Sequence, residues 1–173
     1  MNYLVEILKI ILPSIIVFFT VYFVLKLFLN NEQKKRTDEI SLKNKEVSLP
    51  LRLQAYERLV LLLERIAFEN LIPRIPPQSF TSYEYQSLLI KTIRQEFEHN
   101  LSQQLYVSSE IWETIKNAKE ETISAINSAA AKVQNDSPAI QLSSMIFENV
   151  LKTQDTARHK ALNLLKKEAR MML

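Results

Sequence analysis

The strongest candidate for chemistry in this chain is the segment Glu96-Phe-Glu-His99. A glutamate and a histidine three residues apart share one face of a helix, and two such pairs with two further glutamates form the di-metal sites of four-helix proteins. The only other histidine, His159, has no acid three residues before it; its nearest acid is Asp155. Half of such a site is therefore missing. We expect Glu96 and His99 to be a solvated pair at the polar edge of their helix.

The composition argues against other kinds of active site. The 173 residues include no cysteine and no glycine, although average usage would give about a dozen glycines. Glycine-dependent motifs for nucleotides and for serine nucleophiles are therefore absent. Two isolated histidines do not make a zinc-binding pattern. We expect no catalytic residues, no metal, no cofactor and no small-molecule substrate.

A long apolar segment lies near the amino end. Residues 10 to 25 carry no charge, and the apolar character extends from Leu4 to Leu29. As a helix, this stretch is about 39 Å long, whereas the hydrocarbon core of a bilayer is about 30 Å thick. It is longer than the core of a cleaved signal peptide and is apolar all round, unlike the core helix of a soluble protein. We therefore predict a transmembrane anchor over residues 1–29.

The charges that flank this segment predict its orientation. Lys9 is the only basic side chain before the uncharged run, whereas Lys26, Lys34, Lys35 and Arg36 follow it. The side that is richer in lysine and arginine normally stays in the cytoplasm. We expect a single-pass protein of a bacterial inner membrane, with its amino end outside and residues 30–173 in the cytoplasm.

Residues 30–48 form a charged juxtamembrane linker that contains five bases and four acids. Its few apolar residues do not make a sustained stripe. The sequence leaves open whether this linker is a helix that continues from the anchor or a flexible tether.

Four amphipathic helices are predicted in residues 49–173. Their starts are marked by proline or by hydroxyl residues that cap helices. These signals are Ser48-Leu49-Pro50, the pair Thr81 and Glu84, Ser108 or Ser109, and Ser137-Pro138. The second helix should run to about Gln104, with Ile90, Ile93, Phe97 and Leu101 buried and with Leu89 and Leu105 beside them. The last helix should run from Pro138 to about Met171.

The segment between the first two helices contains Pro73, Pro76 and Pro77, so it cannot be helical throughout. We expect an ordered loop that buries Leu71, Ile72 and Ile75. No pattern of alternating residues competes with the helical interpretation. The predicted fold class is all-α: an N-terminal transmembrane helix followed by a four-helix, bundle-like cytoplasmic domain.

The predicted helix that starts near Pro50 is more apolar than a helix with one solvent-exposed face needs to be. Tyr56, Leu59 and Leu62 belong to a wide apolar face, and Leu61 falls among the charged residues opposite. Two interpretations remain open: a central helix of the domain, or a helix that meets a second chain. Tyr56, Leu59, Leu61 and Leu62 are our candidate protein interface.

The basic residues give a second candidate surface. From residue 150 to the end there are six bases and two acids. Bases at such positions can pair with the acidic middle of the chain or face anionic lipid. The basic tail lacks interleaved aromatic residues, so we expect no nucleic acid partner. The candidate lipid-facing residues are Lys34, Lys35, Arg36, Lys160, Lys166, Lys167 and Arg170.

Two stretches carry a family resemblance: LPLRLQAYERLVLLLERIAFENLIPR (residues 49–74) and DSPAIQL (residues 136–142). The chain resembles an uncharacterised family of small single-span membrane proteins from Bacteroidetes-type bacteria. The resemblance implies the same anchor followed by helices, and it implies no activity and no functional residues.

The sequence therefore favours a membrane-anchored, non-enzymatic helical module that binds protein, as an accessory or scaffold subunit or as a homo-oligomer. The alternative is a peripheral element whose basic C-terminal helix binds anionic lipid. A metal protein that uses Glu96 and His99 is a third and weaker possibility.

Overall fold

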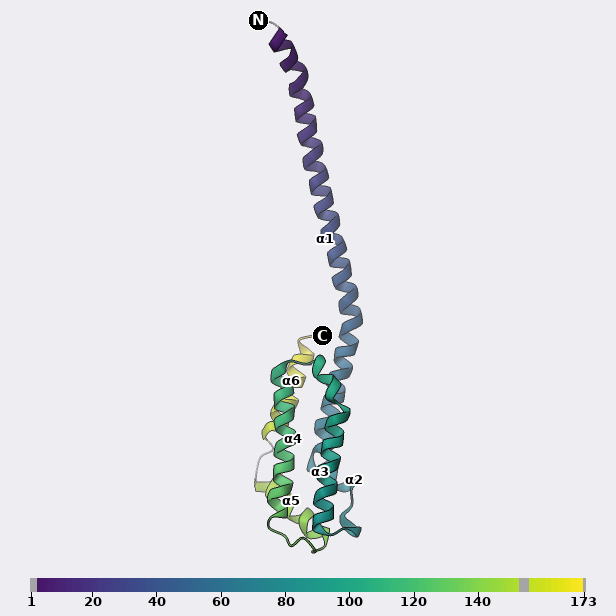
Figure 1. The fold of residues 1–173 in the computed structure, drawn as a ribbon, viewed down its shortest axis with the longest axis vertical. Coiled ribbons are helices and arrows are strands. Elements are labelled where there is room, and N and C mark those ends of the chain that lie inside the picture. Colours follow the sequence, from purple (N-terminus) through teal and green to yellow (C-terminus); the bar gives the residue numbers. More distant parts are fainter. Residues whose placement is uncertain (1–2, 153–155, 173) are drawn as a thin grey trace. The chain divides into compact units, whose positions relative to one another are not determined.

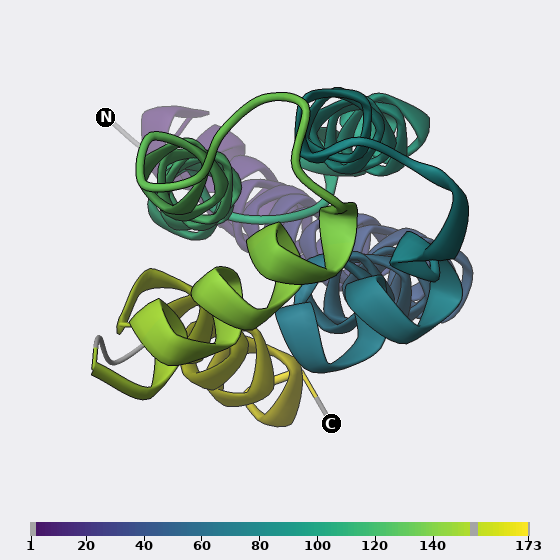
Figure 2. The ribbon, with the colours of Figure 1, turned by 90° about the horizontal axis from the view of Figure 1, so that it is seen from below.

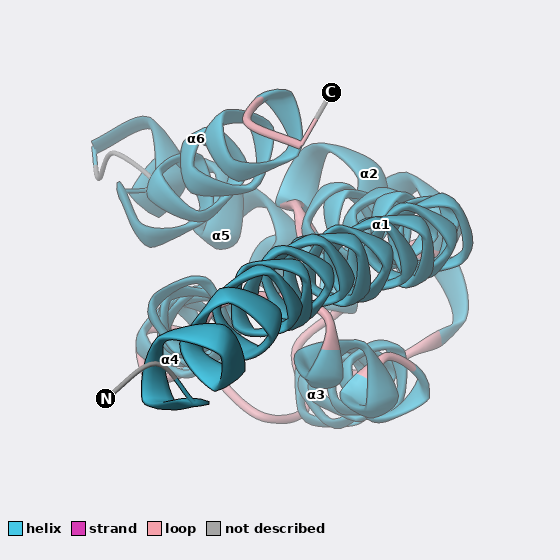
Figure 3. Cartoon of the chain, turned by 90° about the horizontal axis from the view of Figure 1, so that it is seen from above, coloured by secondary structure: helices cyan, strands magenta, loops and turns pink. Residues whose placement is uncertain are grey.

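The computed structural model describes the backbone of residues 3–152 and 156–172, and the side chains of residues 15–40, 42–43, 46–149 and 157–172. The chain divides into two compact units, Met1–Ser48 (unit 1) and Leu49–Leu173 (unit 2). The described residues are almost entirely helical and form no strand (Figure 3). The predicted all-α class is confirmed at this level.

Unit 1 contains the greater part of α1 (Tyr3–Ile66). The linker at residues 30–48, left open by the sequence, is helical. Every side chain between residues 15 and 29 is exposed. Within the described part of the chain, one helical stretch, Ile15–Ile40, is long and apolar enough to cross a membrane as judged by length and composition.

Unit 2 contains the last eighteen residues of α1 and the remaining helices (Figure 1). These are α2 (Phe68–Arg74), η1 (Pro77–Ser79), α3 (Ser82–His99), η2 (Leu101–Leu105), α4 (Ser109–Ala130), α5 (Ala139–Lys152) and α6 (Thr156–Arg170), where η marks a short 3₁₀ helix. α4 packs against α3, α5 and α6, and α5 also contacts α2, α3 and η1. In Figure 2 α5 is seen side-on, whereas α3 and α4 are seen almost end-on, so α5 crosses the other helices at one end of the unit.

A single hydrophobic core joins all of these helices except the two short 3₁₀ turns. From α1 it takes Leu59, Leu63 and Ile66, each at most 1% exposed. Leu71 and Ile72 are buried as predicted, and Ile75 is partly buried. The predicted loop is wrong for its first part, because residues up to Arg74 belong to α2, with Pro73 inside that helix. α3 contributes Tyr85, Leu89, Ile93 and Phe97; α4 contributes Ile111, Trp112, Ile115, Ala118, Ile123, Ile126 and Ala129; α5 and α6 contribute Ala139, Leu142, Ile146, Ala157, Ala161, Leu162 and Leu165.

The N-terminus of α3 confirms the predicted capping box. The Thr81 hydroxyl accepts a hydrogen bond from the Glu84 N–H, and the Thr81 N–H donates to the Glu84 carboxylate at 2.9 Å. These hydrogen bonds stabilise the charged form, so they lower the pKa of Glu84. Ser108 caps α4 in a similar way, because its hydroxyl accepts from the Ile111 N–H.

The N-termini of α3 and α5 are joined by backbone hydrogen bonds that the sequence did not predict. The Ala139 N–H donates to the Phe80 carbonyl at 3.1 Å, and the Ser82 N–H donates to the Ser137 carbonyl at 2.8 Å. The Ser82 and Ser137 hydroxyls share a further hydrogen bond of 2.9 Å. Ser137, predicted to cap α5, donates its hydroxyl proton to the Gln134 carbonyl instead. The first amide of α5 is therefore satisfied by a segment 59 residues earlier in the chain.

Ser48-Leu49-Pro50 was predicted to start a helix, and this prediction is wrong: all three residues lie inside α1. Proline fits the first turn of a helix because it has no N–H to bond, whereas an interior proline, as in α1, removes one hydrogen bond and strains the preceding turn. Local sequence does not separate these two cases. Pro50 here lies just after the boundary between the two units.

The predicted second helix is also too long. α3 ends at His99, and residues 101–105 form η2. Leu101 and Leu105, predicted to extend the buried face, are 41% and 80% exposed. A 3₁₀ helix has three residues per turn, so residues beyond His99 leave the face that the α-helical spacing assigned to them.

The predicted single last helix is two helices, α5 and α6, and residues 153–155 between them fall outside the description. One straight helix over residues 138–171 would be about 50 Å long, whereas α4 is about 33 Å long. Much of the apolar face of such a helix would then extend past the end of α4 and have no helix to pack against. As two helices, α5 packs on α2, α3 and α4, while α6 packs on α4.

Two buried tyrosines test how hydrogen bonding contributes to this fold. The Tyr85 hydroxyl donates to the Ile75 carbonyl at 2.8 Å, whereas the Tyr56 hydroxyl reaches no hydrogen-bond partner among the described residues. Burial raises the pKa of each to about 12, and the nearby Glu168 carboxylate adds to the effect at Tyr56.

We expect Tyr85→Phe to lower the free energy of unfolding by about 1 kcal/mol, because it leaves the Ile75 carbonyl without its donor. Tyr56→Phe should change stability by less than about 0.5 kcal/mol, because no hydrogen bond is lost. Urea unfolding of the detergent-solubilised protein, followed by far-UV circular dichroism, measures both. Equal losses from the two variants would contradict this assignment of the hydrogen bonds.

Candidate functional site

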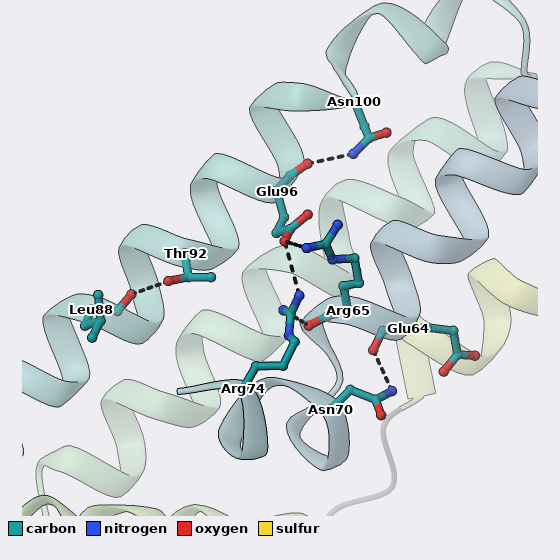
Figure 4. Close-up of polar contacts among 8 residues, drawn as sticks. All are labelled: Glu64, Arg65, Asn70, Arg74, Leu88, Thr92, Glu96 and Asn100. Atoms are coloured by element: carbon teal, nitrogen blue, oxygen red, sulfur yellow. Dashed lines mark hydrogen bonds and ion pairs between the residues drawn. The ribbon is translucent and has the colours of Figure 1, made fainter. Parts of the chain in front are cut away.

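Glu96, the acid of the Glu-x-x-His pair, is not a solvated surface residue. Its side chain is only 14% exposed, and its Oε1 atom pairs with Arg65 Nη2 of α1 at 3.0 Å and with Arg74 Nη1 of α2 at 3.4 Å (Figure 4). The expectation that Glu96 is solvated is therefore wrong. His99, three residues on, is exposed.

The two arginines also fix the turn between α1 and α2. Arg74 Nη2 donates to the Arg65 carbonyl at 2.8 Å, and the Asn70 side-chain amide donates to the Glu64 carbonyl at 2.8 Å. These bonds satisfy carbonyls at the C-terminus of α1 that have no partner within the helix. Figure 4 shows the side chains of Arg65 and Arg74 converging on Glu96 from two different elements. The arrangement holds the α1–α2 turn against α3, and both cations are neutralised in part by a single carboxylate.

This cluster has no means of binding a metal ion. A cation site needs several carboxylate or imidazole ligands, and Glu96 faces two guanidinium groups instead. Among the described residues, no group of three or more His, Cys, Asp or Glu side chains could hold a metal. Nothing in the sequence near Glu96 pointed to the arginines, which lie 31 and 22 residues earlier in the chain.

The candidate protein interface separates into buried and exposed residues. Tyr56, Leu59 and Leu62 are at most 3% exposed and belong to the core of unit 2. They contact helices of this chain, so they are not available to a second chain. Leu61 is 59% exposed and is the one member of the set that a partner could reach.

The candidate lipid-facing bases of α6 are all at the surface. Lys160, Lys166, Lys167 and Arg170 are exposed. Lys34, Lys35 and Arg36 of unit 1 are exposed as well, and Arg36 pairs with Glu32 one turn earlier at 3.5 Å. Exposed i,i+4 pairs of this kind contribute about 0.3–0.5 kcal/mol, so they leave the positive surface largely intact.

One base of the tail has a structural role that sequence did not predict. Arg158 of α6 is 8% exposed, and its guanidinium lies 3.8 Å from the Glu64 carboxylate and 3.9 Å from that of Glu69. The pairing joins α6 to α1 and α2. A sequence count that treats every tail base as solvent-facing therefore overstates the positive surface.

An open groove of about 490 Å³ lies between α4 and α6. Its polar residues include Glu120, Glu121 and Lys160. The Glu121 carboxylate accepts a hydrogen bond from the Ala157 N–H at 3.2 Å, in the first turn of α6. Glu121 thus caps α6, and the groove is open to solvent.

Comparison with known proteins gives one family match, which covers almost the whole chain. Residues 2–172 match a family described as "Family of unknown function (DUF7935)". Because the match covers nearly the whole sequence, the chain belongs to that family. No curated protein and no solved structure matches the chain.

The Glu96 cluster should matter for stability. We expect Glu96→Gln to lower the free energy of unfolding by about 2 kcal/mol, because both arginines lose their charged acceptor in a partly buried setting. Glu98→Gln, two residues away and exposed, is the matched control and should change stability by less than about 0.5 kcal/mol. Chemical unfolding compares the variants; a Glu96→Gln variant as stable as the control would show that the cluster contributes nothing.

Proposed function

We propose that this chain is a membrane-anchored, non-enzymatic helical module that binds another protein, as an accessory or scaffold subunit or as a homo-oligomer. The observation that carries the anchor is the exposure of residues 15–29. Between Ile15 and Leu29, the large apolar side chains are 48–67% exposed. Leaving them in water costs on the order of 15 kcal/mol, which is comparable to the whole stability of a domain, about 5–15 kcal/mol. Lipid removes this cost.

One polar side chain in this stretch, Thr20, also suits a bilayer. The Thr20 hydroxyl donates to the Ile16 carbonyl of its own helix at 2.8 Å. In hydrocarbon, a polar group without a partner costs several kcal/mol. A threonine that bonds to its own backbone avoids that cost without a neighbouring chain.

We infer that unit 2 is a modified four-helix bundle made by residues 49–66 of α1 with α3, α4 and α6. α4 packs on both α3 and α6. Arg65 joins α1 to α3, and Arg158 joins α6 to α1. These contacts connect the four helices in a ring, and α5 crosses one end of it.

The protein-binding part of the proposal rests on Leu61. Its neighbours on the helix surface, Glu57, Arg58 and Arg65, are exposed and charged. An apolar side chain that is surrounded by a polar rim is typical of the centre of a protein interface.

Leu61→Lys should weaken assembly by about tenfold or more in Kd, because a charge at the centre of an interface costs at least about 1.4 kcal/mol. The helical signal in far-UV circular dichroism should persist, since Leu61 is outside the core. The measurement is the mass of the detergent-extracted complex against protein concentration. Ile140→Lys, at a site with 58% exposure, is the control. A wild-type chain that is a lone monomer without any co-purifying protein would refute the binding role.

The flanking charges support an orientation with the amino end outside and unit 2 in the cytoplasm of a bacterial inner membrane. A reporter enzyme that is active only in the periplasm should therefore be inactive when fused after Leu173 and active when fused before Met1. The opposite pattern would reverse the orientation, and recovery of the intact chain in the soluble fraction would remove the anchor.

A further inference from the structure

The part of α1 that belongs to unit 2 has a second face, which is exposed. Its residues recur at alternating intervals of three and four positions: Leu51, Gln54, Arg58, Leu61 and Arg65. This spacing is that of the seam along which one helix packs on another in a coiled coil. Leu51 and Leu61, the apolar members, are 47% and 59% exposed. We call these five residues the outer seam of α1.

Charges of opposite sign lie on the two sides of Leu61. Glu57 and Glu64 are seven residues apart, which is almost two helical turns, so they share one side of the helix. Arg58 and Arg65 repeat at the same interval and share the other side. The sequence Glu-Arg therefore occurs once before and once after Leu61, in the same register.

Contacts within unit 2 show that the two sides face different helices. Arg65 pairs with Glu96 of α3 at 3.0 Å, whereas the carboxylate of Glu64 lies 3.8 Å from the guanidinium of Arg158 in α6. In Figure 4 the side chain of Arg65 points toward Glu96, and that of Glu64 points away from it. The basic side of the outer seam is thus the side next to α3, and the acidic side is the side next to α6.

The charges beside Leu61 can be reached by a second chain. Among the described residues, the side chains of Glu57 and Arg58 have no partner in a hydrogen bond or an ion pair, and both residues are exposed. The side chains of Arg65 and Glu64 are 56% and 46% exposed, although each has a partner within unit 2. A guanidinium group carries five N–H donors, so Arg65 can pair with a second carboxylate as well.

Symmetry determines which charges would meet if the second chain were another copy of this one. Two copies related by a two-fold axis present the same face to each other. If the two α1 helices are parallel, the axis runs along them, and the acidic side of each copy meets the basic side of the other. If the helices are antiparallel, the axis is perpendicular to both, and acidic side meets acidic side. Because like charges across an interface are unfavourable, the outer seam is complementary to itself only in the parallel arrangement.

We propose that unit 2 forms a parallel homodimer through the outer seam of α1. Arg58 pairs with Glu57 of the partner subunit, Arg65 pairs with Glu64 of the partner subunit, and Leu61 lies at the centre. In a parallel coiled coil each seam residue fits between four residues of the facing helix, and for Arg58 these four include the partner subunit's Glu57. The inference rests on the protein-binding role proposed above for Leu61, and it identifies the partner as a second copy of this chain.

The composition of the outer seam implies a reversible dimer. The seam covers residues 51–65, about 21 Å of helix, and two of its five members are arginines. Charged residues within a seam fix the register and the number of helices at a cost in stability. We therefore expect the dimer to dissociate on dilution, so that its Kd can be measured.

Disulfide cross-linking of the full chain in detergent tests the direction of the helices, because the chain has no native cysteine. Only a parallel pair brings both position 54 and position 61 against their own counterparts. An antiparallel pair centred on either position holds the two copies of the other about 21 Å apart, which is too far for a disulfide. Under mild oxidation, Gln54→Cys and Leu61→Cys should therefore each give a cross-linked dimer. Gln141→Cys, at an exposed position of α5, is the control and should stay monomeric.

Charge reversal tests the ion pairs. Glu57→Arg and Arg58→Glu, made separately, each leave like charges on both sides of Leu61, so the Kd of the dimer should rise about tenfold. A mixture of the two variants should dimerise as tightly as the wild type, because one is basic where the other is acidic. Glu113→Arg on α4, with 62% of its side chain exposed, is the control and should leave the Kd unchanged. The measurement is the mass of the detergent-extracted protein against concentration.

Each part of the proposal has a result that would overturn it. Cross-linking at only one of positions 54 and 61 would rule out the parallel arrangement, and an unchanged Kd in both charge-reversed variants would rule out the ion pairs. A chain that cross-links at neither position but purifies with a different protein would overturn the homodimer and leave the protein-binding role of Leu61 intact. A lone monomer with no co-purifying protein would overturn the homodimer and the binding role together.

Discussion

The wide apolar face of α1 between Ala55 and Ile66 is the constraint on which the rest of unit 2 depends. Ala55, Leu59, Leu62, Leu63 and Ile66 are each at most 1% exposed. A stripe this wide cannot be covered by one neighbouring helix, because a helix presents only a narrow seam to each partner. The helices that follow must therefore cover this face of α1 from more than one side. Their own buried faces, around Ile93 of α3 and Leu165 of α6, supply that cover.

α1 also carries charged residues beside its buried face, and these residues form ion pairs with later helices. Arg65 is neutralised by Glu96 of α3, Glu64 lies near Arg158 of α6, and Arg52 pairs with Glu168 of α6. Each pair joins elements that are distant in sequence. Because partly buried charges are costly when unpaired, these contacts favour one arrangement of the helices over alternatives with the same apolar patterning.

The proposed functions place different demands on the two units. The large apolar side chains between residues 15 and 29 of unit 1 are exposed, whereas unit 2 has a hydrophobic core of its own. Three acids of unit 2 have structural roles: Glu96 holds the α1–α2 turn, Glu121 caps α6, and Glu168 pairs with Arg52.

Much of the local structure could be predicted because it depends on neighbouring residues. The capping box at Thr81 and Glu84, the Ser108 cap and the end of α2 just before Pro76 and Pro77 are short-range effects of hydrogen bonding and of missing amide protons. The all-helical class followed from periodicity and from the absence of glycine. Boundaries that depend on packing were predicted less well: α1 continues through Pro50, and the last helix is two helices that cover different neighbours.

The sequence by itself determined the helical class, the caps and the uncharged helix at the amino end, because each follows from residues within a few turns of one another. Only the tertiary structure decided that Glu96 is paired with two arginines, that Arg158 is buried, and that Tyr56, Leu59 and Leu62 face this chain's own core while Leu61 does not. Those outcomes depend on which helices pack together. The spacing of apolar residues shows which face of a helix is buried, but it does not show which other helix covers that face.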